Sequence, residues 1–299
     1  MNRIPQDEKI PIVTSLPMQP ASTFRTLREY VGKIAAVFYQ IRSWWSSRVF
    51  NKEEEPCLQG RVKDLTAALA RETNLAENFT SPGARSAAEN AEKIRAVLGA
   101  IKMLSTRGVD AGNTTIEAVL RNLAEKNSNF SYRIGLIQGT LDLKDAPEMG
   151  NPETATLVAV PVVLKGFGKD HIVAFLVDKT NSTIEYYDSK GLTLSDRGNV
   201  PLYTVAQEKR LWEILRELAK EYNCSALLEN TNKHQWDFYN CGVFVSDFYT
   251  RRVGGESFSS LINKSRTQQE IDGSVRKRLI ENLLSREGEE MRTPRKPPS

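Results

Sequence analysis

The sequence contains few of the residues that build metal centres and disulfide frameworks. Its 299 residues include two histidines and three cysteines, and Cys57, Cys224 and Cys241 follow no regular spacing. An odd number of irregularly spaced cysteines does not indicate a disulfide framework or a zinc site, and it fits a reducing compartment. We therefore expect no metal, and the few histidines and cysteines become the first candidates for chemistry.

Long apolar runs and an excess of one charge are also absent. No apolar run is long enough to cross a bilayer, and the first 20 residues are polar and proline-rich, unlike a Sec-type signal peptide. The 41 basic residues are nearly balanced by 37 acidic residues, so composition alone does not indicate nucleic-acid binding. If the protein leaves its cell of origin, it requires a specialised secretion route.

The N-terminal third divides into segments of different character. We expect residues 1–20 to be disordered. Residues 21–50 carry apolar side chains at helical spacing from Phe24 to Trp45, with five cationic residues beside them, and this predicts a basic amphipathic helix. Such a helix could lie on an anionic membrane or in a partner's groove, or it could pack on its own protein. Residues 51–107 contain a charged linker and two further helical patterns, which we interpret as an accessory region.

Hydrophobic periodicity gives a coarse map of the remaining secondary structure. Apolar side chains make up 40% of the sequence, which is enough for a substantial core. The patterns predict helices at residues 60–80, 84–105, 114–123, 206–222 and 271–284. They predict strands at residues 155–164 and 224–229, with a charged, disordered tail from residue 286 to residue 299.

A polar run in the C-terminal half ends at Cys241, which is followed by Gly242 and an apolar segment. If a helix begins at Cys241, the positive end of its dipole would favour the thiolate, and Gly242 would allow backbone or substrate to approach closely. A cysteine before an apolar run is more often a small buried hydrophobic residue. Residues 243–245 also fit a strand as well as a helix. Cys224 lies in an apolar segment and is interpreted as structural.

Three other residues make the case for Cys241 stronger. His171 begins an apolar run that predicts a buried strand, and a second predicted strand ends at Asp188 after a short turn. A hairpin of these two strands would place both side chains next to each other. Gln235 could donate an amide hydrogen bond to a developing oxyanion. Because a cysteine nucleophile needs a base and the base needs an orienting acceptor, the four residues supply the parts of a catalytic site.

The order of these residues resembles clan CE cysteine proteases, which include Ulp1-like SUMO proteases, adenoviral-type proteases and related bacterial effectors. Asp188 follows His171 by 17 residues, and Cys241 follows Gln235 by 6. The residues from Tyr186 to Ser189 match the family's Tyr-x-Asp-Ser pattern. The resemblance covers roughly residues 108–285, and bacterial members match best in character.

The resemblance implies an α+β fold in which a mixed sheet packs against the helix that carries the nucleophile, with an N-terminal helical extension. Residues 108–285 would form the protease domain, and the extension would hold ubiquitin. Catalysis would use Cys241 as nucleophile, His171 as base, Asp188 as orienting acceptor and Gln235 as oxyanion donor. No cofactor would be needed.

Two departures from the family pattern bear on the substrate. Many members have Trp directly after the histidine, where it flattens the Gly-Gly tail of the substrate, whereas this sequence has Ile172. The residue before the nucleophile is often Asp, whereas this sequence has Asn240. We expect Ile172, Trp236 and Asn240 to contact the substrate, although packing explains Trp236 equally well.

The favoured function is removal of ubiquitin or a ubiquitin-like modifier from lysine side chains by a bacterial effector. Such an effector would be secreted into the cytoplasm of a host cell and would act on ubiquitinated host proteins. The alternatives are a SUMO- or NEDD8-specific protease, a YopJ-type acetyltransferase that uses the same triad with acetyl-CoA, and a binding protein with a decayed site. The acetyltransferases usually have Glu as the acid and a basic inositol-phosphate pocket, whereas this sequence has Asp188 and no obvious basic cluster.

Overall fold

The computed structural model describes residues 55–78, 82–105, 111–136, 142–165, 170–195, 205–264, 266–267 and 270–290. The predicted segments 1–20 and 21–50 lie outside the described residues. The helices are α2 (Glu55–Asn78), α3 (Pro82–Leu104), α4 (Asn113–Lys126), α5 (Val205–Glu221), α6 (Cys241–Val253), α7 (Phe258–Asn263) and α9 (Arg276–Glu290), with a 3-10 turn at Leu143–Asp145 and a π-helical turn at Ile271–Val275. The strands are β1 (Phe130–Tyr132), β2 (Met149–Gly150), β3 (Leu157–Leu164), β4 (His171–Asp178), β5 (Thr183–Tyr187) and β6 (Ala226–Glu229).

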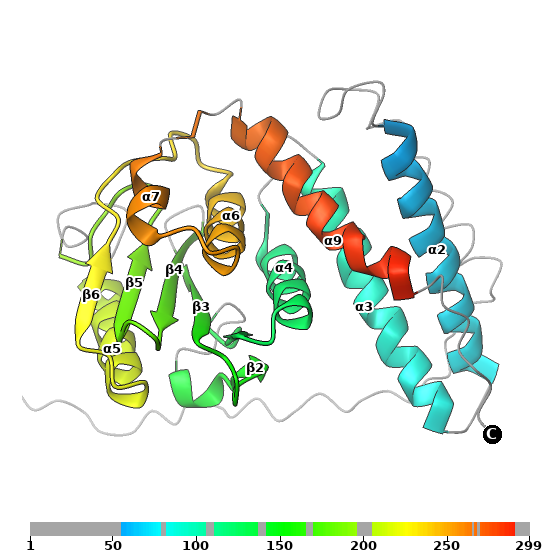
Figure 1. The fold of residues 1–299 in the computed structure, drawn as a ribbon, viewed down its shortest axis with the longest axis horizontal. Coiled ribbons are helices and arrows are strands. Elements are labelled where there is room, and N and C mark those ends of the chain that lie inside the picture. The colour runs from blue at the N-terminus through cyan, green and yellow to red at the C-terminus, as the bar shows by residue number, and fades with distance from the viewer. Residues whose placement is uncertain are drawn as a thin grey trace, which may run out of the picture.

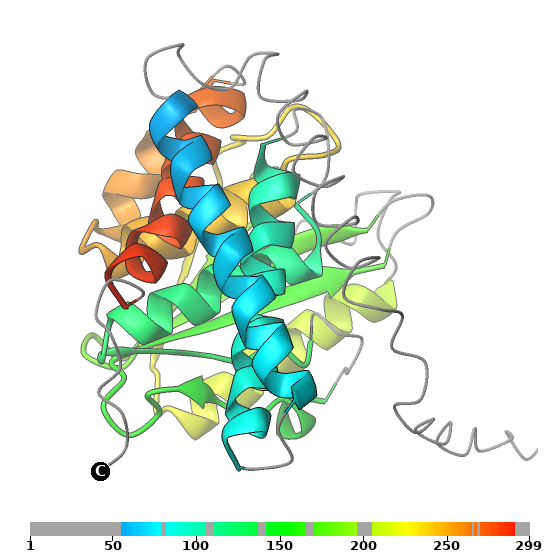
Figure 2. The ribbon, with the colours of Figure 1, turned by 90° about the vertical axis from the view of Figure 1, so that its right-hand side faces the viewer.

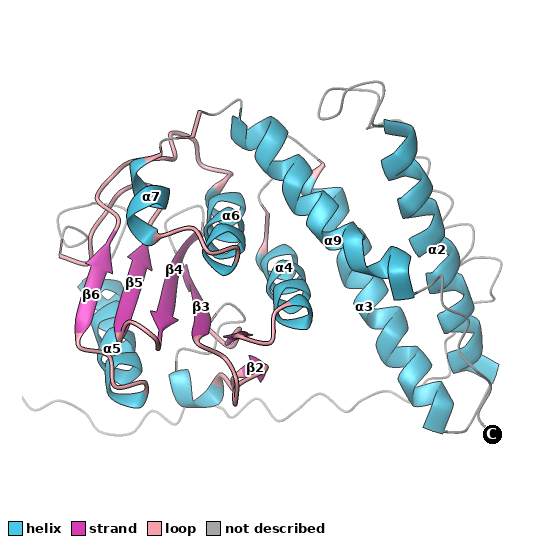
Figure 3. Ribbon diagram, in the orientation of Figure 1, coloured by secondary structure: helices cyan, strands magenta, loops and turns pink. Residues whose placement is uncertain are grey.

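The strands form one mixed sheet in the order β2-β1-β3-β4-β5-β6 (Figure 3). The predicted hairpin is the centre of this sheet, because β4 pairs antiparallel with both β3 and β5. The outer pairs β1–β3 and β5–β6 are parallel. Pro161 lies in β3 beyond the end of β1, so its missing N–H interrupts no ladder on that side. The mixed sheet and its helices therefore give the protein the expected α+β fold.

Alternate side chains of the central strands enter two separate apolar cores. Val173, Phe175 and Val177 of β4 join α5 on one face. Ile172, Ala174 and Leu176 join α4 and α6 on the other face. All eight residues of β4 are buried, as expected of a strand that is covered by helices on both sides.

Helices cover the two faces of the sheet unequally (Figure 1). Of the described α-helices, only α5 packs on one face, whereas α4 and α6 pack on the other. Helices α3 and α9 pack on α4, and α2 packs on α3. Figure 2 looks onto α2 and α3, with the rest of the molecule behind them. Within the described residues, no helix is both long and apolar enough to span a bilayer.

Most predicted elements are confirmed, and residues 243–245 are helical rather than extended. One expectation needs correction: helix α9 continues to Glu290, into the tail that we expected to be disordered from residue 286. The helices of the N-terminal extension share one apolar core with the sheet, because α2 and α3 residues such as Leu65 and Ile101 join the same cluster as Phe244 and Leu283. The region from residue 55 to residue 104 is therefore an integral layer of the fold.

Candidate active site

His171 and Asp188 meet at the ends of neighbouring strands. His171 is the first residue of β4, and Asp188 directly follows the last residue of β5. The Nε2 of His171 lies 2.8 Å from Oδ1 of Asp188. Since the carboxylate can only accept, Nε2 donates, and the proton on Nε2 leaves Nδ1 as the basic nitrogen. The two side chains are 6% and 0% exposed, so water competes little for this hydrogen bond.

Backbone and amide groups hold Asp188 in position. Its Oδ1 also accepts a hydrogen bond of 2.8 Å from the backbone N–H of Lys190. Its carbonyl accepts a bond of 2.8 Å from the side chain of Asn230, which is fully buried. Asp188, the acceptor for His171, is therefore held in place by Lys190 and Asn230.

Cys241 is the first residue of α6 and is 1% exposed. Helix α6 packs against β4, the strand that begins with His171. The next residue, Gly242, lies against the segment before α4, where a Cβ atom would be 2.0 Å from the carbonyl oxygen of Ala111. The glycine is therefore required for backbone packing at the start of α6, which is one of the two roles expected from the sequence.

The loop before Cys241 is anchored beside Asp188. The carbonyl oxygen of Ser189 accepts hydrogen bonds from the backbone N–H groups of His234 and Gln235, at 2.9 and 2.7 Å. The Ser189 hydroxyl donates to Oε1 of Gln235 at 2.6 Å. These bonds place Gln235, and with it the start of α6, at the same end of the sheet as His171 and Asp188. Sequence reasoning used Ser189 only as part of a pattern and did not find this role.

The amide nitrogen of Gln235 is engaged within its own loop. Its Nε2 donates to the carbonyl oxygen of Asp237 at 3.0 Å and to Oδ1 of Asp237 at 3.2 Å. Burial raises the pKa of Asp237, but hydrogen bonds from Tyr239, Asn240 and Gln235 outweigh it and hold that pKa below its ordinary value. Asp237 therefore acts as a charged acceptor at the centre of the loop.

The three residues expected to contact substrate have different surroundings. Ile172 is 3% exposed and its side chain belongs to the same apolar core as Cys241. Asn240 is buried, and its side chain donates to Asp237 at 2.8 Å and accepts from Arg276. Trp236 is 75% exposed, with the ammonium group of Lys233 4.0 Å from its ring centre.

Two further aromatic residues share the surface of this loop. Phe238 and Tyr239 are 59% and 41% exposed, which is unusual for large apolar side chains. Trp236, Phe238 and Tyr239 thus form an exposed aromatic group directly before α6, the helix that begins at Cys241. The sequence shows these residues plainly, but only their exposure distinguishes them from core residues.

His234 and Cys224 lie among groups that indicate structural roles for both residues. His234 accepts from the hydroxyl of Tyr187 at Nδ1 and donates from Nε2 to the carbonyl of Ile262, at 3.0 and 2.9 Å. Burial lowers the pKa of His234, so the neutral ring is favoured. Burial raises the pKa of the Cys224 thiol, which disfavours its thiolate. Neither residue has the partners of a nucleophile and base.

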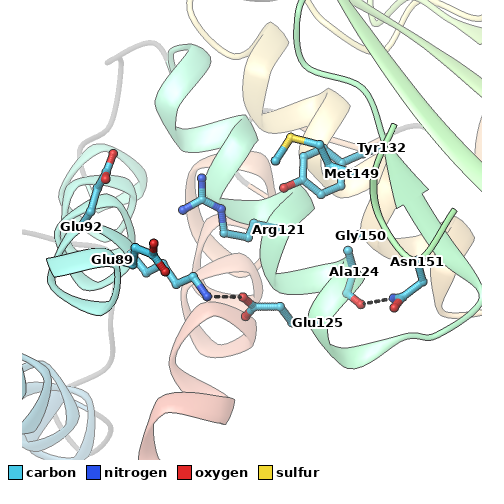
Figure 4. Close-up of a pocket in the computed structure, with 10 residues that line it drawn as sticks. Glu89, Glu92, Arg121, Ala124, Glu125, Tyr132, Met149, Gly150 and Asn151 are labelled. Atoms are coloured by element: carbon cyan, nitrogen blue, oxygen red, sulfur yellow. Dashed lines mark hydrogen bonds and ion pairs between the residues drawn. The ribbon is translucent and has the colours of Figure 1, made fainter. Parts of the chain in front are cut away.

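A cavity of about 450 Å³ lies at the other edge of the sheet (Figure 4). It is lined by α3, α4, β1 and β2, and its charged groups include Arg121 and the ion pair of Lys93 with Glu125 at 3.8 Å. Strands β3 and β4 separate β1 from β5 in the sheet, so this cavity is not part of the His171–Asp188 site. Within the described residues, no cluster of His, Cys, Asp and Glu has the make-up of a metal site.

Comparison with known proteins finds similarity at the level of structure. No protein-family model matches the sequence, and no curated protein matches it. Among solved structures, the SUMO protease Ulp1 with its catalytic cysteine oxidised to a sulfenic acid is 15% identical, with a TM-score of 0.45 over 79% of this chain and 95% of that chain. The C-terminal Ulp1 domain in complex with Smt3, the yeast ortholog of SUMO, is 14% identical, with a TM-score of 0.43 over 63% of this chain and 82% of that chain.

A bacterial protein is among the other similar structures. The Chlamydia trachomatis effector Cdu1 bound to ubiquitin is 12% identical, with a TM-score of 0.33 over 60% of this chain and 83% of that chain. At these identities the similarity concerns the arrangement of helices and strands. The case for an activity therefore rests on the residues of the site.

Proposed function

We propose that this chain is a cysteine isopeptidase that removes ubiquitin or a ubiquitin-like modifier from lysine side chains. The observation that carries the proposal is the buried 2.8 Å hydrogen bond between His171 and Asp188, at the end of the sheet to which Ser189 anchors the loop leading into Cys241. A base held in one tautomer beside the start of a helix that begins with cysteine is the arrangement that thiol-dependent acyl transfer requires.

The proposed reaction proceeds through a thioester. Nδ1 of His171 takes the thiol proton of Cys241, and the sulfur attacks the carbonyl carbon of the modifier's terminal glycine. As the tetrahedral intermediate collapses, the imidazolium gives its proton to the departing lysine amine. A water molecule, deprotonated by His171, then hydrolyses the thioester and restores the thiol. Asp188 stabilises the imidazolium in both halves of the reaction.

The oxyanion would be stabilised by the backbone N–H of Cys241 and by the side-chain amide of Gln235. Ser189 supports this assignment, because its hydroxyl fixes Oε1 of Gln235 and so orients the two amide hydrogens. One of these hydrogens must leave Asp237 when the oxyanion forms.

Two features support a ubiquitin-like substrate. Cys241 and His171 are only 1% and 5% exposed, so a substrate must enter as a slender, extended segment. A C-terminal Gly-Gly tail fits this requirement, because it has no side chains. The exposed aromatic group of Trp236, Phe238 and Tyr239 offers the apolar contact area that a globular modifier would need beside its tail.

The test uses C-terminal fluorogenic conjugates of ubiquitin, SUMO and NEDD8. We expect turnover of at least one conjugate by the wild-type protein and its loss in Cys241→Ala, with Cys224→Ala as the matched control that keeps activity. Retained turnover in Cys241→Ala would disprove the assignment. Transfer of acetyl groups from acetyl-CoA without hydrolysis of any conjugate would instead support a YopJ-type acetyltransferase.

A kinetic test separates the role of Gln235 from substrate binding. An oxyanion donor acts only in the transition state, so Gln235→Ala should lower kcat by roughly 10²–10³ and leave KM nearly unchanged. A rise in KM at constant kcat would assign Gln235 to substrate binding instead.

The setting of this activity is a further part of the proposal. The basic apolar stripe of residues 21–50 supports a tether to an anionic membrane, and the setting that we propose for the activity is the cytoplasm of a host cell. The full protein should sediment with phosphatidylserine-rich vesicles more than a protein that starts at Cys57, and salt should weaken this binding. Equal sedimentation of both proteins would remove the tether from the proposal.

A further inference from the structure

Arg276 is the largest fully buried side chain of the described residues, and it connects two distant parts of the chain. It is the first residue of α9, directly after the π-helical turn at Ile271–Val275. Its Nη1 donates to the carbonyl oxygens of Met103 and Leu104, both at 3.2 Å. These are the last two residues of α3, where a cation offsets the negative end of the helix dipole.

The other end of the same guanidinium reaches the loop of the proposed active site. Nη2 of Arg276 donates to Oδ1 of Asn240, the residue directly before Cys241. The amide nitrogen of Asn240 donates in turn to Oδ2 of Asp237 at 2.8 Å, and its backbone N–H donates to Oδ1 at 2.9 Å. Because the guanidinium occupies the oxygen of Asn240, its nitrogen is directed towards Asp237.

Asp237 completes the connection to Gln235. Its carboxylate also accepts from the backbone N–H of Tyr239 at 2.7 Å, and Gln235 donates to it. The series from Arg276 through Asn240 and Asp237 to Gln235 consists of hydrogen bonds between buried or partly buried groups, where such bonds are stronger than in water. A displacement of Arg276 therefore changes the position of the amide assigned to the oxyanion.

We propose that Arg276 is a positioning residue that connects the C-terminus of α3 to the 235–240 loop and sets the orientation of Gln235. The inference rests on the proposed function for its catalytic consequence. It gives residues 55–104 a role in the active site, because the end of α3 becomes one support of the active-site loop. Residues of the 235–240 loop would contact the reacting groups, and Arg276 would affect catalysis only by positioning that loop.

The first test measures amide hydrogen exchange and does not depend on activity. Arg276→Met keeps an unbranched side chain but removes every donor, and it should speed exchange in residues 235–240 at least about tenfold. Arg278→Met is the matched control: Arg278 is also on α9, is half-buried, and pairs with Asp247 of α6 instead of the loop. Unchanged exchange of the loop in Arg276→Met would overturn the inference, even if the protein proves inactive on every conjugate.

The second test is a double-mutant cycle on kcat. If Arg276 acts through Gln235, Arg276→Met should lower kcat about tenfold in the wild-type background and by less than about twofold in Gln235→Ala. Arg276→Lys, which keeps a charge and donors, should recover part of the loss. An equal loss in both backgrounds would show a general structural role and overturn the inference. Should Arg276→Met not fold, Asn240→Ala breaks the same connection one residue further along, and the same cycle decides.

Discussion

The two faces of the sheet are covered in different ways. On one face, α5 packs on apolar side chains such as Phe175 and Val177, and it is the only α-helix on that face in the part of the chain that the structure describes. On the other face lie α4 and α6, and then α3, α9 and α2. This thicker side contains buried polar groups, among them the ion pair of Arg252 with Glu185 at 2.7 Å and the bonds of Arg276.

The difference shows which kind of contact fixes the geometry of the candidate active site. Apolar packing, which is not directional, supplies free energy of folding on the α5 side, where the ion pair of Arg133 with Glu221 lies at the end of α5. Buried hydrogen bonds on the thicker side are costly unless every partner is in place, so they fix one arrangement. The loop that leads into Cys241 is bound to this side. We expect mutations on the two sides to separate stability from activity.

The largest effect should follow from removing the outer helices. A protein that begins at residue 111 lacks α2 and α3 and exposes apolar side chains such as Ile116 and Leu283, which share their core with those helices. Because domains are only marginally stable, we expect it to have no cooperative thermal transition. A protein that begins at residue 55 is the control and should melt cooperatively. Circular dichroism measures both, and a cooperative transition after deletion of α2 and α3 would show that these helices form a separable module.

A smaller effect is expected from a cavity on the α5 side. Ile214 is fully buried in that core, and Ile214→Ala should lower the free energy of unfolding by about 2–5 kcal/mol. Because this helix lies on the face opposite α6, kcat of the folded protein should not change. Urea denaturation and kinetics on the same sample measure both quantities, with Ile214→Val as the milder control. A tenfold loss of kcat in folded Ile214→Ala would show that the two sides are coupled.

The smallest effect is expected on the pH dependence of stability, and it concerns His234 on the thicker side. The pKa of His234 is lowered in the folded protein, mainly by burial, so the unfolded chain binds a proton more readily. Stability from this residue is present above the unfolded pKa of about 6.5 and is lost as the pH falls through that value towards the folded pKa. His234→Gln keeps a donor for Ile262 and should show a flatter fall in melting temperature between about pH 7 and pH 5. Parallel curves for the two proteins would contradict this assignment.

The sequence predicted the elements of the site better than their connections. The apolar runs of β4 and β5 predicted a hairpin that joins His171 and Asp188, because a turn of a few residues leaves little freedom in their pairing. The helix at Cys241 could not be assigned from local propensity, since residues 243–245 favour a strand equally. The helix predicted at residues 271–284 gave no sign that its Arg276 would reach Asn240.

Strands β1 and β2 and helix α7 were not predicted, but the sequence by itself determined most of the other helices and strands, the hairpin of β4 and β5, and the four residues of the candidate site. These properties depend on hydrophobic period, turn residues and the chemistry that each side chain can perform. Tertiary structure alone decided that α2 and α3 belong to the main core, that Ser189 and Asp237 hold Gln235, and that Arg276 joins α3 to the loop. Arg276 and Leu104 are 172 residues apart in the chain, and such a contact depends on how whole helices pack, which no local pattern records.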